Sequence, residues 1–261
     1  MRRNLNVAVF TALTMGLASC SSLPTDPVAR TEVLRLNDPF EPANRQIYEF
    51  NRAFRETVVG PLADAYNSPG FSTVSVPLSN VLQNLRAPMV FANDLAQGRP
   101  CAAGVTLQRF LINSTVGVAG TFDVADSKAN LKGHENSVAQ TFASWGVPEG
   151  SYLMLPVLGP SNVRGLAGLG VEYFFDPVDR VLSSTGIPRI NKARTGLELF
   201  DAQAGAAADL ARLERSSLDG YAALRSAARQ NEARQFGEPP TCPLPMSTPA
   251  WTTDVFSTGQ R

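Results

Sequence analysis

The sequence predicts an all-α fold for residues 37–236, and three observations support that class. Apolar side chains recur at intervals of three and four residues in several long segments. No segment shows the sustained apolar–polar alternation of a half-buried strand. Glycine and proline stand where these segments end, as they do at the ends of helices.

The N-terminus predicts export and lipidation. Residues 1–19 begin with Arg2 and Arg3, continue into an apolar run and end in small residues, which is the layout of a secretory signal. The run is shorter than the ~20 apolar residues that cross a bilayer. Cys20 follows it in a context that resembles a bacterial lipobox, and two or three acyl chains on this residue would anchor the protein stably. An ordinary signal peptide with a chance cysteine is the alternative.

The polar, proline-containing residues 20–36 predict a flexible tether. Order is expected to start at Asn37. Asp38, followed by proline and by Glu41, predicts a capped helix start. Gly60 and Pro61 are expected to end this first helix.

Two further helices are expected in the first half of the chain. One runs from about Leu78 to Gln97, with a proline inside it, and is stopped by Gly98 and Pro100. The next covers about residues 102–118.

Residues 145–160 carry turn signals at both ends and a short apolar centre, which could be extended or a buried loop. Ser161 is expected to cap a helix that reaches about Phe175 and breaks at Asp176 and Pro177. Three glycines inside this helix predict a close backbone approach or a lipid contact. They are Gly165, Gly168 and Gly170.

The remaining chain divides into a helical part and a tail. Residues 192–235 are rich in Ala, Leu, Glu and Arg and carry an apolar stripe, which predicts one or two long helices. Residues 237–261 are rich in Pro and Thr and are expected to be irregular.

The charge balance argues against a nucleic-acid partner. The formal net charge is zero at pH 7, and it becomes slightly negative once Arg2 and Arg3 are removed with the signal. No basic field is left to hold a phosphate backbone.

The chain contains three cysteines. With Cys20 acylated, Cys101 and Cys242 remain, and disulfides persist in exported proteins. A bridge between them would tie the tail back to the end of an early helix. Two unpaired cysteines are the alternative.

The sequence contains no recognisable catalytic or metal-binding pattern. His134 is the single histidine, and it is expected to be a solvated loop residue without metal-ligand spacing around it. Nucleophile elbows, phosphate-binding loops and zinc-protease motifs do not occur. We therefore expect no enzyme activity, no cofactor and no metal.

Five blocks, in order, resemble the MlaA family, also called VacJ. They are NDPFEPANRQIYEFN (37–51), NLRAPMVFANDLAQGRP (84–100), RFLINSTVGVAGTFDVA (109–125), QTFASWGVPEGSYLMLPVLGPSNVR (140–164) and SLDGYAALRSAARQ (217–230). The resemblance implies an outer-membrane lipoprotein, anchored on the periplasmic side, that removes mislocalised phospholipids from the outer leaflet. It implies a ring-like bundle of amphipathic interfacial helices around an amphipathic channel, beside a trimeric porin, that passes phospholipid to the periplasmic carrier MlaC.

The family blocks also suggest where a lipid path or gate lies. The matching residues are Phe50, Asn51, Asn93, Asp94, Tyr152 and Arg164. Helix packing, capping and turn formation are the alternative roles for these side chains. Gly165 stands where the family often has an acidic residue, which leaves the polarity of the channel open. The rival function is a structural lipoprotein that scaffolds an envelope complex.

Overall fold

The computed structural model describes residue 26, residues 37–184 and residues 188–237. The predicted signal peptide, nearly all of the tether and the tail after Gly237 lie outside the described residues, and so do Cys20 and Cys242.

The first helical stretch is one curved path made of three segments. They are α3 (Glu41–Phe54), the π-helical η1 (Arg55–Val59) and α4 (Gly60–Tyr66). The prediction that Gly60 and Pro61 end the helix is wrong. Gly60 N–H bonds to the carbonyl of Arg55 in the wider π turn, and Pro61 follows in the first turn of α4. A proline is tolerated there because that turn needs no N–H from it.

The predicted cap of this helix is also wrong. Phe40 precedes α3, and no side chain caps the helix. Asp38 is fully buried instead, and its carboxylate accepts hydrogen bonds from Asn44 (2.7 Å) and Arg225 (2.6 Å). The Asp38 carboxylate, which the local sequence assigns to the helix cap, thus forms a long-range ion pair with Arg225 instead.

Helices α5 (Ser72–Ala96) and α6 (Pro100–Thr115) form an antiparallel pair. α5 begins earlier than predicted and contains two prolines. It ends as predicted, at Gly98, which adopts a φ of +68°. α6 ends before the predicted residue 118, because Val118 and Ala119 adopt positive φ values of 54° and 56° that a helix excludes.

Two short helices lie outside the predicted elements. α7 (Val124–Ala129) is capped by Asp123, whose side chain accepts from Asp126 N–H at 3.1 Å. α8 (Val138–Ser144) opens with a capping box between Ser137 and Gln140. Local capping signals were therefore present in both cases, although each helix is too short to show periodicity.

The extended alternative for residues 145–160 is confirmed in part by a β-hairpin. Strand β1 (Tyr152–Leu155) pairs antiparallel with β2 (Gly159–Asn162), with Tyr152 opposite Asn162. α9 (Val163–Phe175) follows directly. Its cap is Asn162, whose side chain accepts from Gly165 N–H at 2.7 Å, so the predicted cap at Ser161 is wrong by one residue. Ser161 belongs to the hairpin instead.

One of the three glycines in α9 makes the predicted close approach to another helix. A Cβ on Gly168 would lie 2.7 Å from the backbone nitrogen of Ala139 in α8. A Cβ on Gly170 would meet nothing within 4 Å. Close packing of α8 on α9 therefore explains the glycine at position 168 but not the one at position 170.

The chain then turns at Asp176 and Pro177, as predicted, into α10 (Pro177–Ser184). Two long helices complete the described fold, α11 (Pro188–Ser216) and α12 (Gly220–Gly237). The prediction of one or two helices over residues 192–235 is thus resolved as two.

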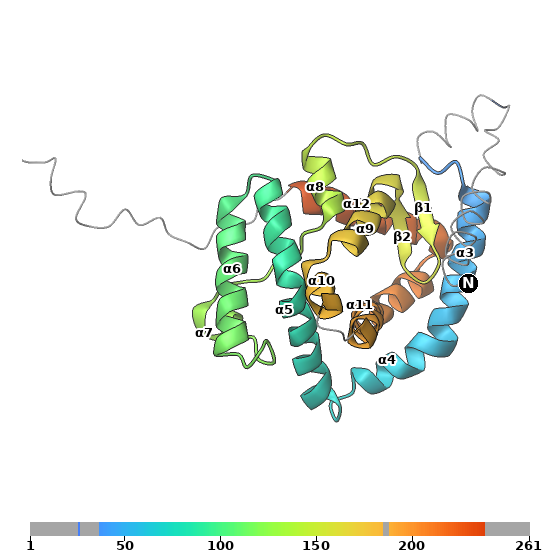
Figure 1. Ribbon diagram of the computed structural model, residues 1–261. Coiled ribbons are helices and arrows are strands. Elements are labelled where there is room, and N and C mark those ends of the chain that lie inside the picture. The colour runs from blue at the N-terminus through green and yellow to red at the C-terminus, as the bar shows by residue number, and fades with distance from the viewer. Residues whose placement is uncertain (1–25, 27–36, 185–187, 238–261) are drawn as a thin grey trace, which may run out of the picture.

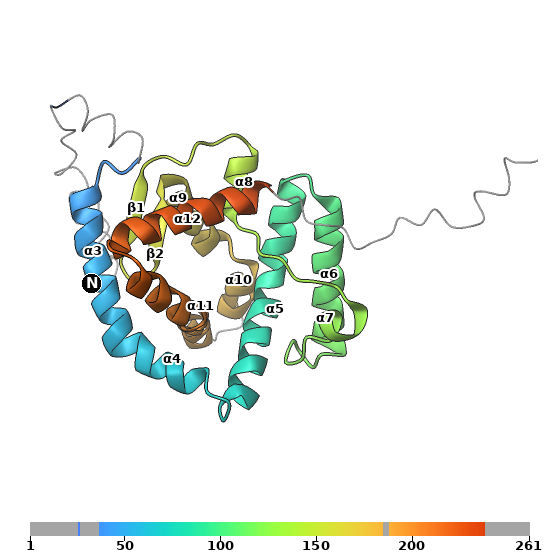
Figure 2. The same ribbon diagram turned by 180° about the vertical axis from the view of Figure 1, so that it is seen from behind.

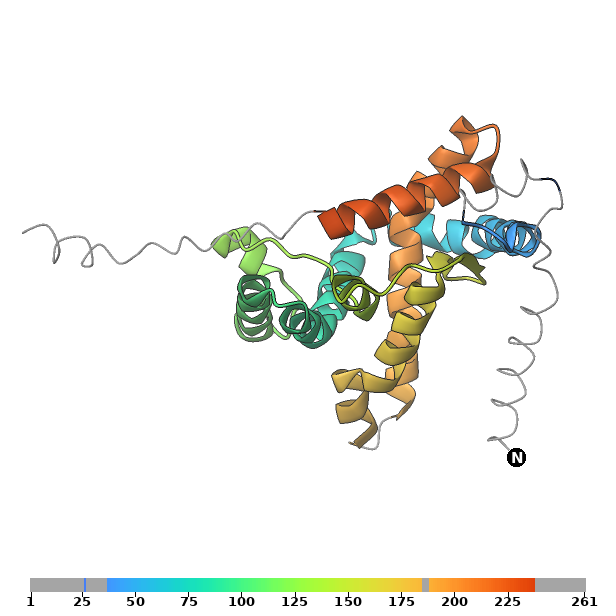
Figure 3. The same ribbon diagram turned by 90° about the horizontal axis from the view of Figure 1, so that it is seen from above.

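The elements form a ring (Figure 1). The curved α3–α4 path, α5, α8 and the hairpin surround α10 and α11, and α6 and α7 lie outside α5. Seen from behind, α12 crosses the ring from the α3 side to the α8 side (Figure 2). Edge-on, α9 and α10 project from one face of the ring and α12 lies on the other (Figure 3). The predominantly helical, ring-like fold expected from the sequence is confirmed.

Buried apolar residues form small separate clusters rather than one large core. The first contains Tyr48, Tyr152, Met154, Tyr221 and Leu224, from α3, β1 and α12. Two others join η1 to α11 and α6 to α7. Among the described residues, polar and charged side chains are buried about as often as apolar ones, so specific polar contacts hold the ring together.

Candidate functional site

Phe50 and Asn51 lie where α3 meets the hairpin. The side-chain oxygen of Asn51 accepts from Val157 N–H (2.7 Å), and its amide nitrogen donates to the Leu155 carbonyl (2.9 Å). Asn51 thus holds the hairpin turn against the ring. Phe50 is 54% exposed and stacks on Phe54 at 6.2 Å.

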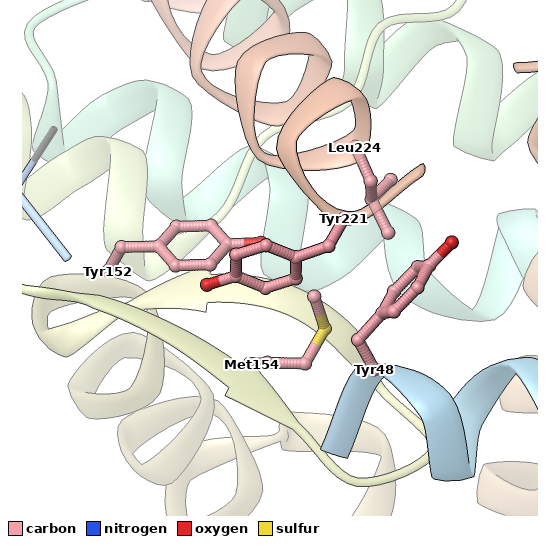
Figure 4. Close-up of a cluster of buried hydrophobic side chains, with 5 residues drawn as sticks. All are labelled: Tyr48, Tyr152, Met154, Tyr221 and Leu224. Atoms are coloured by element: carbon pink, nitrogen blue, oxygen red, sulfur yellow. The ribbon is translucent and has the colours of Figure 1, made fainter. Parts of the chain in front are cut away.

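Tyr152 is a core residue that joins the hairpin to α12. Its ring packs edge-on against Tyr221, with centroids 6.3 Å apart, beside Met154 and Leu224 (Figure 4). Burial, reinforced by the nearby negative charge of Asp38, raises the pKa of the Tyr152 phenol. This side chain stays neutral and serves packing.

Asn93 and Asp94 lie near the end of α5. The Asn93 side-chain oxygen accepts from the Thr141 hydroxyl (2.6 Å), which joins α5 to α8. Asp94 is fully buried and accepts from Thr106 (2.8 Å) and Asn136 (2.7 Å).

His134 also contacts Asp94, with its Nε2 at 2.9 Å and 3.0 Å from the two carboxylate oxygens. The prediction of a merely solvated loop histidine is therefore wrong. Burial by itself raises the pKa of Asp94, but hydrogen bonds from His134, Asn136 and Thr106 outweigh it and lower that pKa from its ordinary value.

Arg164 lies at the start of α9 and is 9% exposed. Its guanidinium donates to the Val147 carbonyl (2.7 Å) and to Glu232 of α12 (2.6 Å). The contact fixes α9 to α12.

The six candidate residues therefore do not gather into one site. They occupy four joints of the ring. Phe50 and Asn51 lie between α3 and the hairpin, Tyr152 between the hairpin and α12, and Arg164 between α9 and α12. Asn93 and Asp94 lie where α5 meets α6, α8 and the chain before α8. Hydrogen bonds support the structural alternatives for Asn93, Asp94 and Arg164, and ring packing supports that for Tyr152. Phe50 and Asn51 remain predictions for a gate. Asn51 holds the hairpin turn, and the adjacent Phe50 has an exposed side chain.

A charged groove of about 940 Å³ separates α3, η1 and α4 from the second half of α11. Its floor includes Arg55, which is 8% exposed and pairs with Glu214, and Glu214 also accepts from the Tyr48 hydroxyl (2.9 Å). At one end Arg45 binds both carboxylate oxygens of Asp219, and these hydrogen bonds lower the pKa of that carboxyl. Charges of both signs suit a hydrated zwitterionic group or a charged protein surface.

The outer surface carries many large apolar side chains. Those more than half exposed include Phe50, Leu62, Val74, Val76, Leu111, Val116, Tyr173, Phe174, Phe175 and Val181. Three consecutive aromatics, Tyr173 to Phe175, end α9 on the projecting face of the ring. No helix among the described residues is both long and apolar enough to span a membrane, and those residues hold no cluster suited to a metal ion.

A family model described as MlaA lipoprotein matches residues 36–235. The chain belongs to the MlaA family. An MlaA protein of Escherichia coli K12, named an intermembrane phospholipid transport system lipoprotein, is 31% identical over 226 residues, which is 83% of this chain and 84% of its own. The MlaA of Haemophilus influenzae is 32% identical over 143 residues, covering 54% of this chain and 57% of its own.

Other relatives extend the same match. An uncharacterized protein of Rickettsia felis is 30% identical over 223 residues, which is 82% of this chain and 84% of its own. A solved chain from work on the structural basis for maintenance of bacterial outer membrane lipid asymmetry aligns with a TM-score of 0.63 at 26% identity. The alignment covers 74% of this chain and 96% of that chain. The MlaA fold is thus present across the described ring.

For the predicted disulfide, the structure describes only one of the two cysteines. Cys101, the second residue of α6, is disulfide-bonded. Cys242 lies outside the described residues, so their pairing stays a prediction.

The charged groove and the contact between Asp94 and His134 were not predicted. Glu214 lies 159 residues from Arg55, and His134 lies 40 residues from Asp94. Local sequence carries no signal for contacts at these separations, although the alternating charges of α3 could have indicated a polar helix face.

Proposed function

We propose that this MlaA family lipoprotein removes mislocalised phospholipids from the outer leaflet of the outer membrane and passes them to a periplasmic carrier, maintaining lipid asymmetry. One structural observation carries the proposal beyond family membership. Large apolar side chains lie outside the ring, whereas Arg55, Arg164, Arg194 and Arg225 are buried within it. Arginine is almost never fully buried in soluble proteins unless it is paired, as these four are, and large apolar side chains are usually inside, so this distribution is partly inverted.

The inverted distribution fits a body that lies among lipids. Exposed apolar area costs about 25 cal/mol per Å² in water, and contact with acyl chains removes that cost. A phospholipid in transit has the opposite need at its headgroup, which loses several kcal/mol if it enters an apolar medium without partners. A ring with charged groups inside and apolar groups outside provides both environments.

The membrane arrangement is part of the proposal. Lipid on Cys20 holds the ring in the inner leaflet, with the aromatic end of α9 directed into the acyl chains and the charged groove open to the periplasm. A trimeric porin lies beside the ring, and MlaC is the carrier. Phe50 and Asn51 are the candidate gate, because Asn51 fixes the hairpin turn and Phe50 exposes an apolar ring beside it.

Transport requires no covalent chemistry. We therefore propose that the protein is not an enzyme. Purified protein incubated with phospholipid should release neither fatty acid nor lyso-lipid, and appearance of either product would contradict this part of the proposal.

The decisive experiment measures phospholipid in the outer leaflet after deletion of the gene. Transport predicts that surface-exposed phospholipid increases and that detergent resistance falls. Unchanged asymmetry would exclude the proposed function. The rival scaffold function predicts instead that an outer-membrane partner disappears from the envelope, which quantitative proteomics of the same strain would reveal.

The lipid anchor supplies a single-residue test. We expect Cys20→Ala to lose both outer-membrane retention and rescue of the deletion strain, because the ring has no membrane-spanning helix among its described residues. Cell fractionation and the asymmetry assay measure the two losses. Cys101→Ala is the matched control for lipidation and should remain membrane-bound. A fully active, soluble Cys20→Ala protein would show that the anchor is dispensable.

A further inference from the structure

A strap of irregular chain, residues 130–137, joins α7 to α8. The strap leaves α7 at Asn130, which adopts a φ of +52°, and enters α8 at the Ser137 capping box. It lies over the α5–α6 pair and lines a polar groove of about 470 Å³ between those helices. Its position therefore depends on side-chain contacts rather than on a backbone ladder.

Asp94 attaches the strap to α5, while Arg109 of α6 holds the start of the strap by donating to the Leu131 carbonyl. The buried carboxylate receives one hydrogen bond from its own helix pair, through Thr106, and two contacts from the strap, through Asn136 (2.7 Å) and His134 (2.9 Å). Gln97 at the end of α5 adds a bond to Asn136. Without these contacts, few described hydrogen bonds would join the strap to α5.

His134 differs from the other contacts because it can change charge. Its side chain is 24% exposed, whereas that of Asp94 is fully buried. A proton can reach the imidazole from solvent without unfolding the strap. Histidine is the side chain whose charge ordinarily changes between pH 5 and 8.

Other charged groups also face this groove and contribute to its field. Arg86 comes from α5, Arg109 from α6, Asp123 and Asp126 from the start of α7, and Lys132 and Glu135 from the strap itself. Arg109 is paired with Asp123 and Lys132 with Asp126, at 2.8 Å and 2.6 Å. The carboxylate that directly contacts His134 is Asp94.

We propose that His134 and Asp94 form a pH-responsive clasp that fastens the strap to α5. A neutral imidazole with its proton on Nε2 donates an ordinary hydrogen bond to the carboxylate. A protonated imidazole donates a charge-assisted bond, which is roughly twice as strong. The clasp therefore tightens as the pH falls through the histidine range and loosens as the pH rises.

A second limit comes from the carboxylate. The pKa of Asp94 is lowered in the folded protein, so the carboxylate stays charged until the pH falls below its ordinary range near 3.8. The clasp is strongest between that limit and the histidine range.

The clasp has a route to the rest of the ring. The strap continues directly into α8, and α8 packs on α9, where Gly168 lets the two backbones approach. α9 carries the exposed aromatics of the projecting face. Release of the strap would remove one of several links between the α5–α6 pair and this projection, since Asn93 and Gln97 of α5 also bond to Thr141 of α8. The clasp itself does not depend on the proposed transport function.

The test is amide hydrogen exchange in the strap of the full mature protein in detergent. Measurements at about pH 5.5 and about pH 8 lie within and above the histidine range, and protection factors remove the intrinsic effect of pH on exchange. We expect residues 130–137 of the wild type to be roughly fivefold more protected at the lower pH, the gain expected of a charge-assisted bond.

Two variants decide the outcome. His134→Gln keeps an N–H donor but cannot titrate, so its strap should show equal protection at both pH values. Glu135→Gln alters a neighbouring charge that is not among the hydrogen-bond partners of Asp94, and it should behave like the wild type. Equal protection in the wild type, or a pH effect that survives in His134→Gln, would overturn the proposal.

A second readout covers the case in which exchange in the strap is too fast to measure. The clasp predicts that the melting temperature of the wild type exceeds that of His134→Gln by more at about pH 5.5 than at about pH 8. A difference that is the same at both pH values would also overturn the proposal.

Discussion

At the scale of single residues, Asp38 shows how strongly this protein relies on buried charge. Its carboxylate is completely buried and pairs with Arg225 (2.6 Å), whose side chain is 8% exposed. Tyr221 donates its hydroxyl to the same carboxylate. This ion pair joins the beginning and the end of the described chain. Because a charge is costly to bury without a partner, replacing either residue should destabilise the fold.

We predict that Arg225→Met destabilises the protein by about 3–5 kcal/mol, since it leaves Asp38 buried and unpaired. Thermal unfolding of the purified protein measures the loss. The double variant Asp38→Asn/Arg225→Met should recover part of it, because the remaining amide carries no charge. Arg212→Met is the matched control, since the Arg212–Asp209 pair is largely exposed and should change stability little. A similar loss in both single variants would contradict the prediction.

Asp123 supplies a prediction about acid stability. Burial alone raises its pKa, but hydrogen bonds from Arg109 and Asn113 outweigh burial and lower it from the ordinary value of 3.8. A lowered folded-state pKa stabilises the protein above the unfolded value, and this stabilisation is lost as the pH falls through the folded value.

We therefore expect the α6–α7 junction to lose protection from hydrogen exchange below about pH 4. Asp123→Asn should remove much of this acid sensitivity and lower stability at neutral pH, where the ion pair with Arg109 is present. Asp179→Asn, on α10, is a control at a distant site. An α6–α7 junction that stays fully protected under acid would count against this account.

At the scale of elements, the packing of α8 on α9 depends on one glycine of a pair. A Cβ on Gly168 would lie 2.7 Å from the Ala139 nitrogen, whereas a Cβ on Gly170 would enter open space. The two positions lie in the same helix, so they share helix propensity and differ in what surrounds them.

We predict opposite signs for the two alanine variants. Gly168→Ala should destabilise the protein by about 1–3 kcal/mol through overpacking against backbone. Gly170→Ala should stabilise it by up to about 1 kcal/mol through helix propensity. Chemical unfolding of each variant in the same detergent measures both changes. Equal effects would show that α8 can shift without cost.

The elements also show why some boundaries escape sequence patterns. Gly60 and Pro61 predict a helix end, yet the helical path continues from the π turn of η1 into α4, which begins at Gly60. The packing of η1 and α4 on α11 favours this continuation, and that packing is absent from the local sequence. By contrast, Asp176 and Pro177 end α9 as predicted, since proline at that point begins a new helix.

At the scale of the whole molecule, the ring has two unlike faces. α9 and α10 project from one face with exposed aromatic side chains, and α12 lies on the other (Figure 3). The charged groove lies between the curved α3–α4 path and the later part of α11. In the proposed arrangement, this asymmetry sets the orientation of the ring with respect to the membrane surface.

We predict that the aromatic end of α9 contributes to membrane binding. A Cys20→Ala protein carrying Tyr173→Ser, Phe174→Ser and Phe175→Ser should bind phosphatidylethanolamine–phosphatidylglycerol vesicles more weakly than Cys20→Ala alone. Each aromatic side chain contributes about 1.5–3 kcal/mol when it is removed from water. Vesicle flotation measures the bound fraction. Serine at Leu218, which is fully exposed but lies at the α11–α12 turn, is the control and should change flotation little.

Features that depend on a few neighbouring residues could be predicted from the sequence. The helical class and the ends at Gly98 and Asp176 follow from caps, breakers and periodicity. The export signal and the lipidation of Cys20 follow from the N-terminal pattern and stay predictions. The ordered blocks also identified the family, because a match across most of residues 37–236 is far more specific than one motif.

Which polar residues are buried, and what they bind, depends on contacts between segments far apart in the chain and could not be predicted from the sequence. Asp38 meets Arg225 across 187 residues, and Asp94 meets His134 across 40. A carboxylate in a cap, on a solvated face or in a buried ion pair looks the same in a sequence. The difference arises from the solvent and charges that the fold brings around it, so the charged groove, the clasp and the joints of the ring become visible only once the helices are packed.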